Sequence, residues 1–368
     1  MPYAISAVIL FAVPNSTVLV KAVYMFVTYN LCTTVCYTAT NVPYSTLTSM
    51  ISRDQHDRDM LSIYRMGIAP FGRILAVSFT LPLVKVFGDT QSSWIKTMAI
   101  WATIAVILNL WCFAKCKENV EIEARKNVKV PLGKSLKALL TNQYFYAGIF
   151  FQMFQNILFA ITGTMLPYYC KYVFHNDSWL YSAMYLAETV LMIIITMAFS
   201  PWLLKRFGKK KMSLGGIVIA VMGQIILLAN PYNQTLVFLS CILRGIGFAP
   251  LNSVFYGFVN EAVEFGQWKS HIRQEGPIFA GSNMGTKFGA GAASAIMTSL
   301  MGYAGYISTT GGTITQPDSA IQMIMGIYKW GPLLVFAGYT VLLLLYKLEK
   351  RYPEIMKELE EREARGEL

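Results

Sequence analysis

Residues 204–230 read LKRFGKKKMSLGGIVIAVMGQIILLAN, and this stretch decides the fold class. The segment 212–230 contains no charged residue, whereas five Lys and Arg side chains precede it within 205–211. A helix needs about 20 predominantly apolar residues to cross the hydrocarbon layer of a membrane. Lys and Arg gather in the short loops on the cytoplasmic side. The stretch therefore predicts a transmembrane helix that follows a cytoplasmic loop.

The composition of the whole chain agrees with a membrane protein. Of its 368 residues 55% are hydrophobic and 14% are charged, and the mean hydropathy is +0.45. Soluble domains usually carry about 25% charged residues, so much of this protein's surface must face lipid. A net charge of +11 would suggest a nucleic-acid partner in a soluble protein. Because most basic residues lie between apolar runs, we attribute the charge to membrane topology and expect no nucleic-acid partner.

Nine segments are long enough to span a bilayer, so we predict an all-α, polytopic membrane protein. They lie near 17–47, 60–87, 93–114, 143–170, 178–203, 212–230, 234–260, 276–302 and 323–346. A shorter apolar segment, Pro2 to Val13, precedes them. As a helix it reaches roughly 18 Å, against a hydrocarbon thickness of about 30 Å. We expect half a span there.

Basic residues alternate between the loops and predict the orientation. The connections 48–59, 115–140, 204–211 and 261–275 carry them, and the opposite connections carry almost none. These loops and the carboxyl tail are therefore expected in the cytoplasm, with the protein in the plasma membrane.

The long charged connection divides the spans unequally, with three and a half before it and six after it. Two six-helix halves joined by a cytoplasmic loop is the plan of major facilitator transporters. On that plan we expect half of the third span and spans four to six at the amino end, with two and a half helices missing. The expected parts are 1–115 for this remnant, 116–140 for the central loop, 141–347 for the carboxyl-terminal six-helix bundle and 348–368 for the tail.

Charged residues deep in the predicted spans are candidates for function. A charge at the bilayer centre costs at least roughly 2.5–3.5 kcal/mol, so such residues usually line a pathway or pair with one another. A structural ion pair and a functional site are both open for each. These residues are Arg65, Arg73, Arg244, Lys287 and Glu188.

Three polar stripes recur at helical spacing within the spans. The first is Asn30, Thr34, Tyr37, Asn41 and Ser45, the second Gln152, Gln155 and Asn156, and the third Arg244, Asn252, Tyr256 and Asn260. Polar side chains with an aromatic ring suit a sugar, whose hydroxyls need hydrogen-bond partners and whose ring face packs on an aromatic plate. Polar contacts between membrane helices are the alternative interpretation. Glycines 281, 285, 289 and 291 are typical of a helix that approaches its neighbour closely.

Two stretches contain motifs that are more specific than hydrophobic periodicity and charge. The first is YTATNVPYSTL at 37–47, with DQHDRD at 54–59 and YR at 64–65; the second is NEAVEFGQWKSHIRQEG at 260–276, with KFGAG at 287–291. Together they resemble the glycoside–pentoside–hexuronide:cation symporter family. The similarity extends over essentially the whole chain, including PYY at 167–169, LKRFGKKK at 204–211 and the tail YKLEKRYPEIMKEL at 346–359.

The resemblance implies sugar:cation symport by alternating access between two halves. It implies that Tyr37, Asn41 and Arg65 line the sugar cavity from the amino half. Gln152, Asn156 and Tyr256 of the polar stripes are our further candidates for binding sugar.

From the carboxyl half, the resemblance places Lys269 near the cation and sugar sites. It also implies that Glu264, Arg273 and Glu275 belong to a charge network that closes the cytoplasmic gate. Glu264 and Arg273 can pair when the halves meet and separate when they part.

Two departures from the family concern the coupling cation, which is sodium or a proton. Some relatives have Asp where this chain has Asn41, and an amide cannot hold a cation by charge. The family's paired cation-binding carboxylates lie on a helix that precedes the start of this sequence. As it stands, we expect this chain to lack the cation site.

Two other classes of protein share some of these features. A non-transporting remnant or regulatory membrane protein that keeps the scaffold remains an alternative. An intramembrane enzyme is disfavoured, since no His pair, metal-ligand cluster or activated nucleophile occurs and the histidines His56, His175 and His271 lie in loops. We therefore expect no enzymatic activity and no cofactor besides the cation. The expected partners are a small sugar or glycoside and the lipid bilayer, and the expected state is a monomer.

Overall fold

The computed structural model describes residues 2–52, 54–88, 90–116, 131–175, 179–307 and 315–365, and all regular structure within them is helical. The all-α prediction is confirmed for this part of the chain. The helices are α1 Pro2–Ile9, α2 Val18–Asn30, η1 Leu31–Cys36, α3 Tyr37–Ile51, α4 Gln55–Val86, α5 Gln91–Lys115, α6 Leu132–Leu140, α7 Gln143–Tyr172, α8 Leu180–Ile194, η2 Ile195–Phe199, α9 Ser200–Ala229, α10 Gln234–Ser253, α11 Phe255–Ser270, α12 Glu275–Tyr303, α13 Asp318–Leu345 and α14 Leu348–Ala364. Two of them, η1 and η2, are π-helical turns inside longer helices.

Six helical segments in the described residues are long and apolar enough to cross a membrane, by length and composition alone. They are Val18–Thr48, Gln91–Lys115, Gln143–Tyr172, Leu180–Ala229, Gln234–Ser270 and Asp318–Leu345. Seven of the nine predicted spans fall on these segments, because Leu180–Ala229 holds two, and the predicted span 234–260 ends ten residues before its segment does. The predicted spans 60–87 and 276–302 are the helices α4 and α12, which lie outside this apolar set. The count of nine spans stays a prediction.

The contacts between helices divide the chain into two units, one of residues 1–58 and 68–123 and the other of 59–67 and 124–368. In the first unit α1 packs on α5 and η1. The rings of Phe11 and Trp94 stack with centroids 5.8 Å apart. The side chain of Gln91 donates to the carbonyl of Val13 over 2.6 Å. These contacts hold the short α1 against the start of α5.

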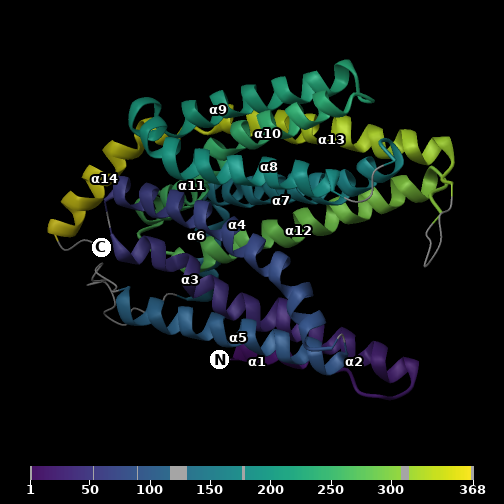
Figure 1. The fold of residues 1–368 in the computed structure, drawn as a ribbon. Helices are drawn as coiled ribbons and strands as arrows, with labels where there is room; N and C mark the ends of the chain where they lie inside the picture. The colour runs from purple at the N-terminus through teal and green to yellow at the C-terminus, as the bar shows by residue number, and fades with distance from the viewer. Residues whose placement is uncertain are drawn as a thin grey trace. The chain divides into compact units, whose positions relative to one another are not determined.

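In the second unit α7 runs beside α12 and α13, and α9 runs beside α10 (Figure 1). The seam between α7 and α12 depends on glycine. A methyl group added at Gly285 would overlap the carbonyl oxygen of Ile149, and one at Gly289 would overlap that of Met153. The close approach predicted from the four-residue glycine spacing is confirmed, since the backbones touch where side chains are absent.

A break at Gly208 separates α9 into two parts. Its φ of 76° and ψ of 171° are not helical, and a positive φ is a conformation that glycine adopts at little cost. The predicted loop at 204–211 is therefore a bend of the backbone rather than an extended connection. The bend starts a new helical segment at Lys209, whose first backbone N–H groups have no partners within the helix.

Candidate functional site

Residues 59–67 of α4 belong to the second unit, whereas the parts of α4 before and after them belong to the first. Three side chains at three-residue spacing, which share one face of the helix, make the contacts. Asp59 pairs with Lys209, the hydroxyl of Ser62 donates to the carbonyl of Ser253 over 2.7 Å, and the guanidinium of Arg65 lies 4.0 Å from the ring centre of Tyr256. This face of α4 therefore joins α9, α10 and α11 through polar contacts.

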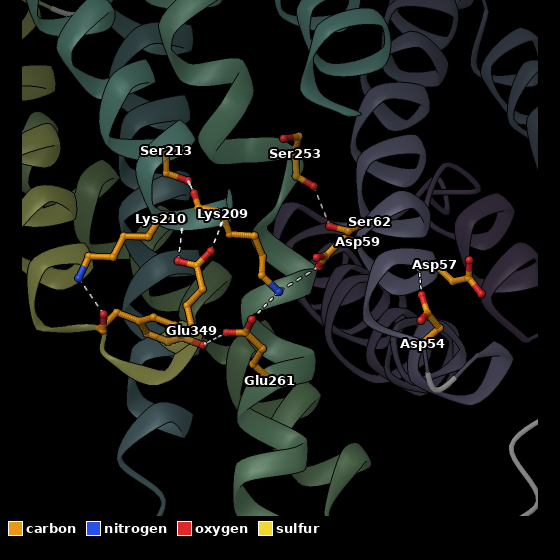
Figure 2. A network of polar contacts seen from close by, with 11 residues as sticks. Asp54, Asp57, Asp59, Ser62, Lys209, Lys210, Ser213, Ser253, Glu261 and Glu349 are labelled. Carbon is orange, nitrogen blue, oxygen red and sulfur yellow. Dashed lines mark hydrogen bonds and ion pairs between the residues drawn. The ribbon is translucent and has the colours of Figure 1, made fainter. Parts of the chain in front are cut away.

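The contact at Lys209 is a buried cluster of charges (Figure 2). The ammonium group of Lys209 lies 3.2 Å from a carboxylate oxygen of Asp59 and also contacts Oε1 of Glu261. The hydroxyl of Tyr346 donates to Oε2 of Glu261 over 2.6 Å. Lys209, Asp59 and Glu261 are 2%, 4% and 1% exposed. We call Asp59, Lys209, Glu261 and Tyr346 the Lys209 cluster.

One ammonium faces two carboxylates in the Lys209 cluster, so its formal charge is −1 when all three groups are ionised. Removing one partner of a buried ion pair typically costs about 3–5 kcal/mol, because the other charge stays buried without compensation. Either carboxylate alone can neutralise the ammonium. The cluster can therefore lose one acid and keep its cation paired, which suits a contact that forms and separates.

The bend at Gly208 places Lys209, and the carboxyl tail holds it there. The carboxylate of Glu349 accepts from the backbone N–H of Lys209 over 2.7 Å and from that of Lys210 over 3.1 Å (Figure 2). These are the first donors of the helical segment after the bend, and a carboxylate is favourable at a helix N-terminus. The ammonium of Lys210 donates to the carbonyl of Tyr346 over 2.8 Å.

Some of the residues predicted to bind sugar lie on α7 and α11 of the second unit. Tyr256 is buried beneath the guanidinium of Arg65. The amide of Asn156 donates to the carbonyl of Gln152 in its own helix over 2.9 Å. Gln155, which shares a stripe with Gln152, donates to Asn252 on α10. The second and third polar stripes thus meet, and the side chains around Gln155 leave no room for a water molecule.

Several buried polar atoms in this region have no hydrogen-bond partner within the described part of the chain. They are Oε1 of Gln152, Oδ1 and Nδ2 of Asn260, Oγ of Ser282 and Nδ2 of Asn283. A methyl group added at Gly148 would lie 2.8 Å from the Ser282 hydroxyl oxygen and 3.7 Å from Val259, so α7, α11 and α12 meet there. Buried polar groups are normally hydrogen-bonded. Within the described residues, donors and acceptors without a partner therefore lie on three helices.

Lys269 lies away from this group. It is exposed near the end of α11, and its ammonium donates to the carbonyl of Thr141 over 2.7 Å. Along the helix it stands roughly 20 Å from Tyr256 at about 1.5 Å per residue. In this structure Lys269 ties α11 to the end of α6, and its place in a sugar or cation site stays a prediction.

Of the three residues predicted to form a gate, Arg273 contacts both of the others. Arg273 contacts Glu264 over 3.1 Å and Glu275 over 2.6 Å, and it donates to the side chain of Gln267 over 2.6 Å. Burial disfavours the charge on Arg273, but the two carboxylates outweigh it and raise the pKa of the guanidinium above its ordinary value.

This charge network connects α11 to α12 within one unit. The pair of Glu264 and Arg273 thus stabilises the turn between two helices. Its place in a gate stays a prediction.

Tyr37 and Asn41 belong to the first unit, on α3. The Tyr37 ring lies 6.1 Å from that of Tyr3, and Asn41 is half-buried. Their assignment to a sugar cavity stays a prediction.

Of the basic residues predicted deep in the spans, Arg244 is fully buried. Its guanidinium binds both carboxylate oxygens of Glu188, over 2.8 and 2.6 Å, and donates to the hydroxyl of Tyr328 over 2.8 Å. The three side chains come from α10, α8 and α13. Both interpretations of these charges remain open, but the geometry is that of an ion pair that fastens three helices together. Arg73 and Lys287 have exposed side chains.

The Lys209 cluster was missed from the sequence. The charge pattern assigned Lys209 to a cytoplasmic loop, where Lys is usually exposed. Asp59 and Glu261 lie in the motifs quoted above, but no functional role was predicted for either of them. Glu261 precedes Glu264 by three residues, one helical turn, and this spacing was the available signal.

The fold and this site define a polytopic membrane protein that buries polar groups between helices, as transport proteins do. Comparison with known proteins identifies the group. Residues 1–350 match the family model described as MFS/sugar transport protein. The chain therefore belongs to the sugar transport family of the major facilitator superfamily, and the resemblance found in the sequence is confirmed.

Relatives match along almost the whole chain. An isoprimeverose transporter of Lactiplantibacillus pentosus is 28% identical over 99% of this chain and 75% of the relative. A putative sulfoquinovose importer of Salmonella typhimurium is 27% identical, over 99% and 76%. A putative glycoside/cation symporter of Escherichia coli, YagG, is 26% identical, over 100% and 79%. The function is membrane transport within this family.

Proposed function

We propose that this protein carries a small sugar or glycoside across the plasma membrane together with a cation, sodium or a proton, by alternating access. The names of the three relatives support a sugar-like substrate and one of them supports a cation. In this proposal the nine predicted spans cross the membrane, the carboxyl tail is cytoplasmic and the transporter acts as a monomer. The carboxyl-terminal bundle is 141–347, and the loop 116–140 joins it to the helices before it.

One observation supports a sugar site most directly. Gln152, Asn260 and Ser282 come from three helices and have buried polar atoms without partners in the described chain. A sugar presents hydroxyls that both donate and accept, so amide and hydroxyl side chains can each bind it. Tyr256 supplies an aromatic ring near this group, one turn from Asn260. The guanidinium of Arg65 lies over that ring and can also donate hydrogen bonds to sugar hydroxyls.

We assign the substrate-binding residues on this basis. Gln152, Asn156, Tyr256 and Arg65 form the part of the site in the second unit. Tyr37 and Asn41 are proposed to bind the sugar from the amino-terminal helices, and Lys269 to act at the cytoplasmic end, on the evidence of the family motifs.

The Lys209 cluster is proposed to hold the cytoplasmic end closed. Asp59 lies on α4, before the central loop, whereas Lys209 and Glu261 follow it. Opening of that end requires Asp59 to leave Lys209, while Glu261 keeps the ammonium paired. Glu264, Arg273 and Glu275 are proposed to brace the same end by fixing the turn from α11 to α12.

Uptake of labelled sugars into proteoliposomes tests the function. Isoprimeverose, neutral glycosides and sugar acids are supplied in turn, with an inward gradient of sodium, of protons or of neither. We expect one of them to enter the vesicles, and the gradients then test whether this chain couples that uptake to sodium, to protons or to neither. Accumulation of none, by protein shown to be folded, contradicts the proposal.

A pair of isosteric variants then tests the site. Ser282→Ala removes a hydroxyl without a partner, whereas Thr162→Val removes one that donates to its own helix at Leu158 over 3.0 Å. We expect Ser282→Ala to raise the KM for sugar by about 5- to 10-fold, the loss of roughly one hydrogen bond. Thr162→Val should leave the KM unchanged. Equal effects of the two variants contradict the assignment.

A further inference from the structure

The carboxyl tail helix α14 packs on the same elements that form the Lys209 cluster. Residues 352, 355 and 359 are buried on one face of α14, and α14 lies against α11. A tail that merely followed the last span into water would show no buried face. The tail helix is therefore part of the folded second unit.

Polar contacts link this helix and the turn before it to both partners in the cluster. Glu349 accepts the backbone N–H groups of Lys209 and Lys210, and Tyr346 donates to Glu261. A methyl group added at Gly208 would lie 2.7 Å from Oε1 of Glu349, so the carboxylate fits a space that only glycine leaves. The tail thus fixes where the Lys209 backbone stands and which way the Glu261 carboxylate points.

Further along the chain, α14 forms hydrogen bonds with Trp268 near the end of α11. The indole N–H of Trp268 donates to Glu358 over 2.7 Å, and Arg362 donates to the carbonyl of Trp268 over 3.0 Å. Glu358 is also held by Arg362. These contacts anchor α14 at two places, one at the bend before Lys209 and one at Trp268.

We propose that Glu349 and Tyr346 are positioning residues that set the strength of the contact between Lys209 and Asp59. This inference rests on the proposed closing function of the cluster. Glu349 holds the backbone at Lys209, and Tyr346 occupies one oxygen of Glu261 so that the other faces the ammonium. When Asp59 departs, these two residues keep Lys209 and Glu261 together and ready to receive it again. The tail thereby takes part in transport, because it controls the contact that closes the cytoplasmic end.

A cysteine reporter tests the proposal without any substrate. Ser62 is fully buried on α4, one turn from Asp59, so Ser62→Cys becomes accessible when this face of α4 separates. Its alkylation by N-ethylmaleimide is followed by mass spectrometry of the peptide. Native Cys241, fully buried within the second unit, reports global unfolding in the same sample.

We expect Glu349→Ala to raise the alkylation rate of Ser62→Cys about tenfold, the factor for one charge-assisted hydrogen bond. Glu349→Gln, which keeps an acceptor but loses the charge, should give a smaller increase. Glu360→Ala, a matched change at an exposed position of the same helix, should give none. The rate at Cys241 should stay constant in all of them.

Asp59→Asn provides the second arm. It should raise the rate at Ser62→Cys by itself, and Glu349→Ala added to it should raise the rate no further, because both act through one contact. If Asp59→Asn has no effect, the closing function of the cluster is wrong. If Asp59→Asn acts but Glu349→Ala does not, or if the two effects multiply, the inference about the tail is wrong while the function stands. If the alkylation rate at Cys241 rises equally, the variant opens the whole unit. The role of the tail is then purely structural, and the inference about it is also wrong.

Discussion

Replacement of Lys209 by methionine is the most severe test of the buried cluster. Methionine fills a similar volume but removes the ammonium that two buried carboxylates, Asp59 and Glu261, contact. At an effective dielectric constant of about 20, charges at the 3.2 Å separation of Lys209 and Asp59 attract by about 5 kcal/mol before desolvation. Breaking a buried pair costs about 3–5 kcal/mol net. We expect that loss in Lys209→Met.

Asp59→Asn should be far milder, because Lys209 keeps Glu261. We expect about 1.5 kcal/mol, the value of one hydrogen bond to a charged group. At about 2 °C per kcal/mol, the Tm falls by roughly 6–10 °C for Lys209→Met and by about 3 °C for Asp59→Asn. The measurement is thermal unfolding in detergent at one scan rate.

A neutral triple variant controls for packing. Lys209→Met combined with Asp59→Asn and Glu261→Gln leaves no charge within the Lys209 cluster, so it should recover most of the Tm. If Lys209→Met is as stable as Asp59→Asn, or if the triple variant is no better than Lys209→Met, then the ammonium is not the group that compensates two buried acids. The charge arithmetic would then be wrong.

Three further predictions concern other parts of the second unit. Gly208→Ala places a methyl group at a positive φ and against the tail carboxylate, so we expect a loss of about 1–3 kcal/mol in thermal unfolding; an unchanged Tm would contradict it. Tyr256→Phe keeps the ring beneath Arg65 and should preserve stability, whereas Tyr256→Leu should lose about 0.5–2 kcal/mol, measured in the same way. Glu188→Gln leaves Arg244 buried without its counter-charge and should cost about 3–5 kcal/mol, and adding Arg244→Met should restore most of it if the pair is structural.

The length and position of most helices could be predicted because they depend on local sequence. The predicted span 276–302 and the helix α12 agree to within a residue at each end. The glycines at 285 and 289 predicted that a neighbour comes close but not that the neighbour is α7. Periodicity states which face of a helix is special, and the partner of that face is set by packing between residues far apart in the chain.

The same limit explains the missed cluster. Asp59 and Lys209 are separated by 150 positions, and nothing local marks either as buried. The tail offered a better signal, since Tyr352, Ile355 and Leu359 stand at helical spacing on an otherwise charged segment. Apolar residues at steps of three and four indicate a helix that packs on something. Treating the tail only as a charged cytoplasmic end overlooked this.

The predicted sugar-site residues differ in how far the sequence indicates their surroundings, and their role in binding sugar stays a prediction. Gln152 and Tyr256 lie near atoms that lack partners in the described chain, because their polar stripes turn toward the same interface. Lys269 is different, since its long side chain reaches a backbone carbonyl at the end of α6. A motif predicts that such a residue matters, but the direction of a flexible side chain is decided by which acceptor lies within reach.

The distribution of partners around Lys209 favours separation at one contact over the other. Glu261 is held on both oxygens, by Lys209 and by Tyr346, and its helix α11 is gripped by the tail at Trp268. Lys209 is itself fixed through its backbone by Glu349. Asp59 arrives from α4, whose later part belongs to the other unit. Separation at the contact of Asp59 with Lys209 therefore leaves Lys209 and Glu261 paired, and these two charges do not have to find a new counter-ion.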